Sequence, residues 1–212
     1  MALAKICGLS TAPAVEAALA GGAAFLGFML FEASPRDVRP SLAGRLAAPA
    51  RSKARIVAVT VDPDDEFLAR LMAELTPDLI QLHGAETPHR VREIAVRTGA
   101  AVIKAVPVST AGDLDAARVY DGVADHLMFD ARPPTDASRP GGHGAAFDWA
   151  LLAGRRFERP WFLAGGLDPW NVAAAIAASS APMVDVSSGV ERGPGLKDPA
   201  LIIRFLGAVG AS

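Results

Sequence analysis

A single cysteine stands at the end of the first apolar run of the chain, in the stretch MALAKICGLS. This residue, Cys7, is the only cysteine in a chain of 212 residues. Because a thiolate is a reactive group, Cys7 could carry a chemical function. A lone thiol also packs as a small apolar side chain. Which role applies depends on the polar residues that share its surroundings.

Other polar residues follow apolar runs in the same way, each at the point where a run ends. Gln81 and His83 end the run in DLIQLHG, and Asp130 ends the run in HLMFD. In a barrel of parallel strands, the carboxyl ends of the strands meet at one mouth, where catalytic groups lie. These side chains would therefore converge with Cys7, and this placement favours a functional thiol over an inert one.

Glycine-rich turns follow the last two apolar runs. Gly165 and Gly166 in LAGGL come just before a predicted helix, and Ser187, Ser188 and Gly189 follow the run in VDVSSG. Glycine lets backbone N–H groups approach an anion, and the loops after strands seven and eight of a barrel commonly bind phosphate. Each turn alone is equally typical of a simple chain reversal. Together, on adjacent strands, they predict a phosphate site.

The remaining candidates have more ordinary alternatives. Arg36, in the proline-stiffened turn SPR, could hold a carboxylate through two parallel hydrogen bonds, or be a solvated surface side chain. Asp185 falls inside an apolar run, where a buried carboxylate needs hydrogen-bond partners, so we expect a structural role. The histidines, including His89 in a predicted helix and His126 at a strand start, lack the spacing of a metal site. We expect no metal and no cofactor.

Short apolar runs that alternate with amphipathic segments are expected to position these residues. Eight such units predict one closed (β/α)₈ barrel domain over residues 1–212, with an open doubly wound sheet as the alternative. The segment Ala131–Gly144, rich in proline and glycine, is predicted to be a loop. The predicted strands are Ala4–Cys7, Phe25–Phe31, Arg55–Val61, Leu79–Leu82, Ala101–Ala105, His126–Asp130, Trp161–Ala164 and Met183–Val186. The predicted helices are Ala14–Ala20, Asp64–Leu75, Thr87–Thr98, Ser109–Val119, Asp168–Ala178 and Asp198–Leu206.

The balance of positive and negative residues indicates which kinds of molecule the chain binds. The chain has 21 Lys+Arg against 23 Asp+Glu, a balance that argues against a nucleic-acid or acidic-membrane surface. A single cysteine cannot form an internal disulfide, which fits a reducing compartment. We therefore expect a cytoplasmic protein with a small phosphorylated substrate, no membrane contact and no obligate protein partner.

The motifs, taken in order, resemble those of the phosphoribosylanthranilate isomerases of tryptophan biosynthesis. The resemblance rests on KICGL, SPR, QLHG, the aspartate of FD, GGHGAAFDW, LAGGLDPWNV and VDVSSGVERGPGLKD, which span nearly the whole chain. The chain departs from the usual family pattern at His143, Ala145 and Ala146, and in AVTVDP after the third run. These departures could alter loop packing or the fit of the substrate.

The resemblance implies a cofactor-independent Amadori rearrangement of N-(5-phosphoribosyl)anthranilate to 1-(2-carboxyphenylamino)-1-deoxyribulose 5-phosphate. It implies that Asp130 is the general acid at the ribose ring oxygen, Cys7 the general base at the sugar C2, and Arg36 the partner of the anthranilate carboxylate. A free carboxyl and a free thiol are both in the wrong form at neutral pH, so their surroundings must shift both. The remaining substrate-binding residues are expected to be Gln81, His83, Gly165, Gly166, Ser187, Ser188 and Gly189.

Other functions fit parts of the pattern. A sugar isomerase of histidine biosynthesis generally pairs aspartates on strands one and five, whereas Cys7 ends the first run here and KAVP the fifth. Indole-glycerol-phosphate synthase keeps a lysine and glutamates at strand ends, and Lys104 has no matching glutamates. A barrel that only binds a phosphorylated ligand is a third alternative. The presence of both Cys7 and Asp130 argues against it.

Overall fold

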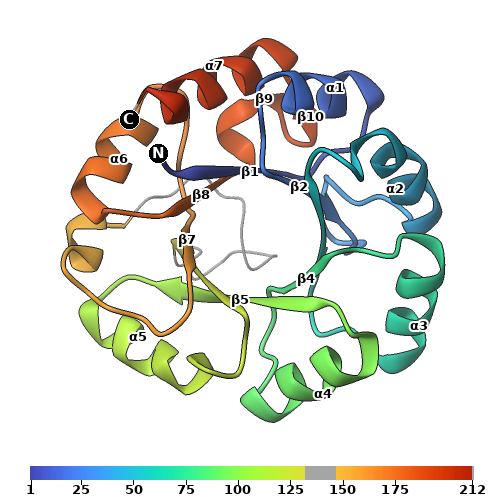
Figure 1. The fold of residues 1–212 in the computed structure, drawn as a ribbon, viewed down its shortest axis with the longest axis horizontal. Coiled ribbons are helices and arrows are strands. Elements are labelled where there is room, and N and C mark those ends of the chain that lie inside the picture. The colour runs from blue at the N-terminus through green and yellow to red at the C-terminus, as the bar shows by residue number, and fades with distance from the viewer. Residues whose placement is uncertain (132–146, 212) are drawn as a thin grey trace.

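The computed structural model describes residues 1–131 and 147–211. Its parallel strands close into a barrel in the order β1 to β8, with β8 hydrogen-bonded to β1. Figure 1 looks down this barrel and shows the helices as a ring around the strands. The predicted (β/α)₈ barrel is therefore confirmed, and the open-sheet alternative is wrong. Most of the predicted loop, with His143, Ala145 and Ala146, lies outside the described residues.

The barrel strands all lie within or close to the predicted apolar runs, and their ends differ by a few residues. Their continuous apolar character reflects burial on both faces, since helices cover the outside and side chains fill the inside. The largest difference is in the fifth strand, which continues beyond Ala105 and pairs there with the sixth. The strands are β1 Leu3–Cys7, β2 Phe25–Met29, β3 Arg55–Thr60, β4 Leu79–Leu82, β5 Ala101–Val108, β6 His126–Ala131, β7 Trp161–Leu163 and β8 Met183–Val186.

Three of the helices begin at a capping side chain. Asp64, Thr87 and Asp198 each accept a hydrogen bond from a backbone N–H of the first turn. The helix α2 was not predicted, because its buried positions are only proline and alanine. A short hairpin of β9 (Glu191–Gly193) and β10 (Leu196–Lys197) was not predicted either. The helices are α1 Ala12–Ala20, α2 Pro40–Ala47, α3 Asp65–Glu74, α4 Pro88–Thr98, α5 Ala111–Ala116, α6 Val172–Ser179 and α7 Pro199–Gly210.

Alternate residues of each strand face the inside of the barrel. Cys7 belongs to an apolar cluster there that also includes Phe25, Met128 and Met183, and this cluster is separate from the one beneath the helices. Side chains two residues apart on a strand point to the same face. Asp130 therefore faces the interior above Met128, as Asp185 does above Met183.

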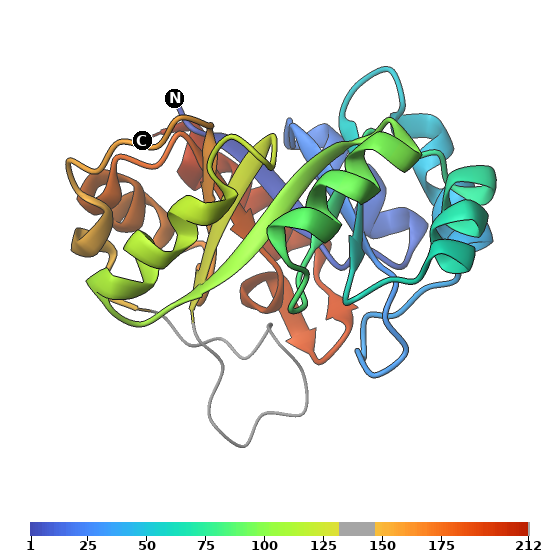
Figure 2. The ribbon, with the colours of Figure 1, turned by 90° about the horizontal axis from the view of Figure 1, so that it is seen from below.

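The two faces of the barrel differ in what they carry. Figure 2 shows the N- and C-termini together on one face and the β9–β10 hairpin projecting from the opposite face. Because this hairpin follows β8, the opposite face holds the carboxyl ends of the strands and is the mouth of the barrel.

No helix in the described part of the chain is long and apolar enough to span a membrane.

Two glycines in outer helices give a matched test of this packing. A Cβ at Gly44 in α2 would overlap the carbonyl oxygen of Glu74 at the end of α3, whereas a Cβ at Gly207 in α7 would meet nothing within 4 Å. We expect Gly44→Ala to lower the free energy of unfolding by about 1–3 kcal/mol through overpacking. We expect Gly207→Ala to raise it by up to about 1 kcal/mol, because alanine is the better helix former. Urea denaturation followed by circular dichroism measures both, and equal shifts would contradict the close approach of α2 and α3.

Candidate active site

Five neighbouring strand ends carry most of the predicted site. Going round the mouth, Asp130 lies in β6, the Gly165–Gly166 turn follows β7, and the Ser187–Gly189 turn follows β8. Cys7 then ends β1, and Arg36 lies in the loop after β2. The closed strand order thus brings together residues from both ends of the chain. Asp130 and Cys7 flank the two glycine-containing turns.

Cys7 is almost fully buried, with 3% of its surface exposed. Burial raises the pKa of its thiol above the usual value; the positive charges of Lys5 and Lys197 oppose that rise, and the carboxylate of Asp185 adds to it. The thiol form is therefore favoured. The backbone of Gly8, next to Cys7, passes so close to Arg36 that a Cβ at Gly8 would lie 2.7 Å from the Arg36 Cδ.

Asp130 lies at the end of a line of polar side chains that contact one another. Its Oδ2 lies 3.2 Å from Nε2 of His83, whose Nδ1 lies 3.1 Å from Nε2 of Gln81. If the Gln81 amide donates to Nδ1, the His83 ring carries its proton on Nε2 and donates it to an ionised Asp130. Asp130 lies in β6, Gln81 lies in β4 and His83 directly follows β4, so the contact spans the end of β5.

The same line of side chains can also accept a hydrogen bond from a protonated Asp130. Gln81 Oε1 is buried and has no hydrogen-bond partner among the described residues. A half-turn of this amide would place Oε1 against Nδ1 of His83, which would then carry the ring proton. Nε2 of His83 would be free to accept a hydrogen bond from the Asp130 carboxyl group. The two orientations of the amide therefore present either a donor or an acceptor to Asp130.

The turns after β7 and β8 pack directly against each other. A Cβ at Gly189 would overlap the carbonyl oxygen of Leu167, and a Cβ at Gly165 would overlap the backbone nitrogen of Ala131 and lie 3.0 Å from Asp130 Oδ1. Gly165 also has φ +87°, which L-residues rarely adopt. These contacts join the glycine turns to each other and to Asp130, as a shared anion site requires.

Each turn is also held by a side chain. The amide of Asn171 donates to the carbonyl oxygen of Gly166 at 2.8 Å, in a turn before α6 where the sequence predicted the first helical residues. The ammonium of Lys197 donates to the carbonyl oxygen of Ser187 at 2.8 Å. The backbone N–H groups of both turns are therefore fixed before any anion binds.

Arg36 is buried, with 3% of its surface exposed, so the surface alternative for it is wrong. Its Nε and Nη2 donate to the two carboxylate oxygens of Glu191, at 2.7 Å and 2.9 Å. Lys197 also donates to Glu191, at 2.6 Å. Burial alone would raise the pKa of Glu191, but the bond from Arg36 and the charge of Lys197 outweigh it, and the pKa lies below its usual value. Burial lowers the pKa of Lys197.

Sequence reasoning missed several charged partners. Glu191 and Lys197 lie within the quoted motif VDVSSGVERGPGLKD, but they were given no role. Asp185 was expected to need a hydrogen-bond partner, which was not identified; it is Lys5, whose Nζ lies 2.8 Å from Asp185 Oδ1. Lys104, the lysine considered for a synthase, is buried, bound to Glu86 at 2.7 Å, and lines the same cavity as His83 and Asp130.

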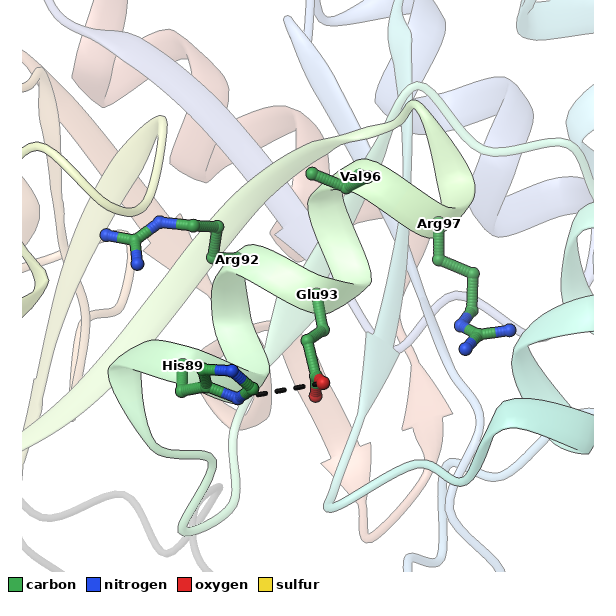
Figure 3. A pocket seen from close by; sticks show the side chains of 5 residues that line it. All are labelled: His89, Arg92, Glu93, Val96 and Arg97. Carbon is green, nitrogen blue, oxygen red and sulfur yellow. Dashed lines mark ion pairs between the residues drawn. The ribbon is translucent and has the colours of Figure 1, made fainter.

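Two hollows differ in their relation to this site. A cavity of about 700 Å³ beside β5 and α5 is lined by His83 and Asp130, so it reaches the proposed acid. A second hollow lies on the outer face of α4, and all five side chains drawn in Figure 3 come from that helix. There His89 pairs with Glu93 at 3.6 Å, an ordinary surface contact.

In residues 1–131 and 147–211, no three His, Cys, Asp or Glu side chains form a metal-binding cluster.

Comparisons with known proteins agree with this arrangement. Residues 4–208 match the family model described as N-(5'phosphoribosyl)anthranilate (PRA) isomerase. An N-(5'-phosphoribosyl)anthranilate isomerase of Caulobacter sp. (strain K31) is 67% identical over 99% of both chains. One of Mesorhizobium japonicum is 50% identical over 98% of this chain and 95% of its own.

Solved structures give the same result. A phosphoribosyl anthranilate isomerase from Thermotoga maritima superposes with a TM-score of 0.90 at 34% identity, covering 100% of both chains. Another solved isomerase, in complex with reduced 1-(o-carboxyphenylamino)-1-deoxyribulose 5-phosphate, has a TM-score of 0.86 at 32% identity and covers 100% of both chains. The chain therefore belongs to the N-(5'-phosphoribosyl)anthranilate isomerase family of tryptophan-biosynthesis enzymes.

Proposed function

We propose that Cys7 and Asp130 act as general base and general acid in the isomerisation of N-(5'-phosphoribosyl)anthranilate. The observation that carries the proposal is their placement. Both side chains belong to the inward-facing set, on strands that flank the two glycine turns. A substrate whose phosphate lies on those turns would extend its sugar between the thiol and the carboxyl group.

In the first step, Asp130 donates a proton to the ribose ring oxygen. The bond between that oxygen and C1 breaks, and the nitrogen lone pair forms a C1=N double bond, which gives the protonated Schiff base. Asp130 is left as a carboxylate, to which His83 can donate because Nε2 of His83 lies 3.2 Å from its Oδ2. The Gln81–His83 chain thus stabilises the product state of the acid.

In the second step, the Cys7 thiolate removes the proton from C2. The electrons of the C2–H bond form a C1=C2 double bond, and those of the C=N bond return to nitrogen, so the iminium charge is neutralised. The enolamine then becomes the ketone: C1 gains the proton held by the Cys7 thiol, the C2 hydroxyl group loses its proton, and the C1=C2 double bond is replaced by C2=O. The hydroxyl proton restores Asp130 to its acid form, so both groups return to their starting states. The reaction therefore needs no redox partner and no net proton.

The charged groups of the substrate have matching groups at the mouth. The solved relative that binds the reduced product shows that an isomerase of this fold holds a phosphate and a carboxylate together. Here Gly165, Gly166 and the Ser187–Gly189 turn would donate backbone N–H groups to the phosphate. Arg36 would bind the anthranilate carboxylate through Nη1, which donates to no described residue while Nε and Nη2 hold Glu191.

Replacement of the acid and of the base tests the assignment. We expect Cys7→Ser and Asp130→Asn each to lower kcat by about 10²–10⁴-fold, the usual contribution of general acid–base catalysis. The assay follows the decay of anthranilate-type fluorescence, with substrate made in place from anthranilate and phosphoribosyl pyrophosphate by a coupling transferase. Circular dichroism checks that both variants are folded. Near-normal turnover in either folded variant would remove that residue from the mechanism, and no turnover by the unmodified chain would favour a ligand-binding barrel.

The phosphate site is tested by a change of one methyl group. Gly189→Ala would push the β8 turn away from Leu167, whereas Gly193→Ala, in the nearby β9, would bring its Cβ only to 3.8 Å from Leu196. We expect Gly189→Ala to raise KM, and the inhibition constant of inorganic phosphate, by about tenfold or more, with a smaller effect on kcat. Gly193→Ala is the control and should leave both constants unchanged. Equal phosphate inhibition in the two variants would place the phosphate elsewhere.

A further inference from the structure

Lys5 places a positive charge inside the barrel, and no step of the proposed reaction involves this charge. It is 0% exposed and lies two residues before Cys7 in the motif KIC. Residues two apart on a strand share a face, so both side chains point into the interior. A buried ammonium group is costly to remove from water, and it persists where its surroundings compensate the charge.

Gly27 shows how far the Lys5 side chain reaches. On β2 this glycine is the register partner of Cys7, not of Lys5. A Cβ at Gly27 would lie 3.1 Å from Cys7 Cα and 3.2 Å from Lys5 Nζ. Gly27 is not among the residues with positive φ, so the backbone does not require glycine there. The missing side chain instead leaves space for the ammonium group at the level of Cys7.

Asp185 keeps the ammonium group in this position. Asp185 and Lys5 are register partners across the β8–β1 pairing, and Oδ1 of Asp185 accepts a hydrogen bond from Nζ at 2.8 Å. Burial alone would lower the pKa of Lys5, but attraction by Asp185 and Cys7 outweighs it and raises the pKa above the usual value. Lys5 is therefore a cation at neutral pH.

The charges around the thiol leave one positive charge in excess. Lys5 and Asp185 face it from β1 and β8, and Lys197 acts on it from β10. Arg36 packs against the backbone of the residue that follows Cys7. Glu191 binds both Arg36 and Lys197. Three cations thus face two carboxylates. A negative charge on sulfur would restore neutrality.

We propose that Lys5 is the positioning residue that stabilises the Cys7 thiolate, with Asp185 fixing the ammonium group beside the sulfur. This inference rests on the proposed role of Cys7 as the base. When the thiol loses its proton, the new negative charge lies beside an ammonium group from which water is excluded. The attraction is stronger there than for a solvated lysine. Because Lys5 is fully buried and Asp185 binds its ammonium group, the charge is shielded from the anionic groups of a substrate bound at the turns.

The single cysteine makes the ionisation directly measurable. The pH titration of thiolate ultraviolet absorbance, with Cys7→Ser as the blank, gives the midpoint for Cys7 without turnover. Lys5→Met and Asp185→Asn break the same ion pair but remove opposite charges. We expect Lys5→Met to raise the midpoint by about one pH unit or more, and Asp185→Asn to leave it unchanged or lower it. In Lys5→Met, kcat should fall about tenfold at neutral pH and recover in alkali, with KM little changed.

The double variant Lys5→Met/Asp185→Asn covers the case in which a single variant fails to fold, because it removes both buried charges at nearly constant volume. Its midpoint should lie above that of the unmodified chain, since Lys5 acts on the thiol more strongly than Asp185 does. A midpoint at or below the unmodified value, or shifts of the same sign in both single variants, would overturn the proposal. Full turnover in Cys7→Ser would instead overturn the role of Cys7 as base, whatever the titrations show.

Discussion

The pairing of β8 with β1 is the constraint on which the site depends. Register partners from Leu3 to Ile6 and from Met183 to Val186 close the barrel. The same register sets Asp185 opposite Lys5 and places the serine turn beside the strand that ends at Cys7. A shift by one residue would turn every inward-facing side chain of β8 outward, so closure and site geometry are fixed together. The thiol thus owes its surroundings to the last strand of the barrel, which is remote from it in sequence.

Buried charge, rather than apolar contact, fixes the rim of the barrel. Arg36, Glu191 and Lys197 form one network that joins the loop after β2, the β9–β10 hairpin and the serine turn. Breaking a buried ion pair leaves an uncompensated charge, so each member holds its loop against displacement. Such a network adds little to stability compared with apolar side chains of similar size. Its value is geometric, because the turns are positioned before a substrate arrives.

The sequence predicted what depends on local pattern. Parallel strands buried on both faces appear as continuous apolar runs, so every barrel strand was found, and Cys7 and Asp130 were placed correctly at strand ends. The helix α2 was missed because it is only 8 residues long and its fully buried positions are proline and alanine, which mark a core face weakly. Glu191 was missed for a different reason. Its pairing with Arg36 spans 155 residues, and only the closed fold brings the two together.

The acid and the base need opposite environments within one small mouth, and the barrel supplies them from different strands. Asp130 faces the end of β4, where a histidine and an amide can present either a hydrogen-bond donor or an acceptor to it. Cys7 lies on β1 beside β8, and it shares β1 with the cation Lys5, which Asp185 of β8 holds in place. A lysine on the surface would be screened by water and by the substrate's own anions. Neither water nor the substrate's anions reach a lysine inside the barrel. Only the absence of a side chain at Gly27 leaves room for the ammonium group beside the thiol.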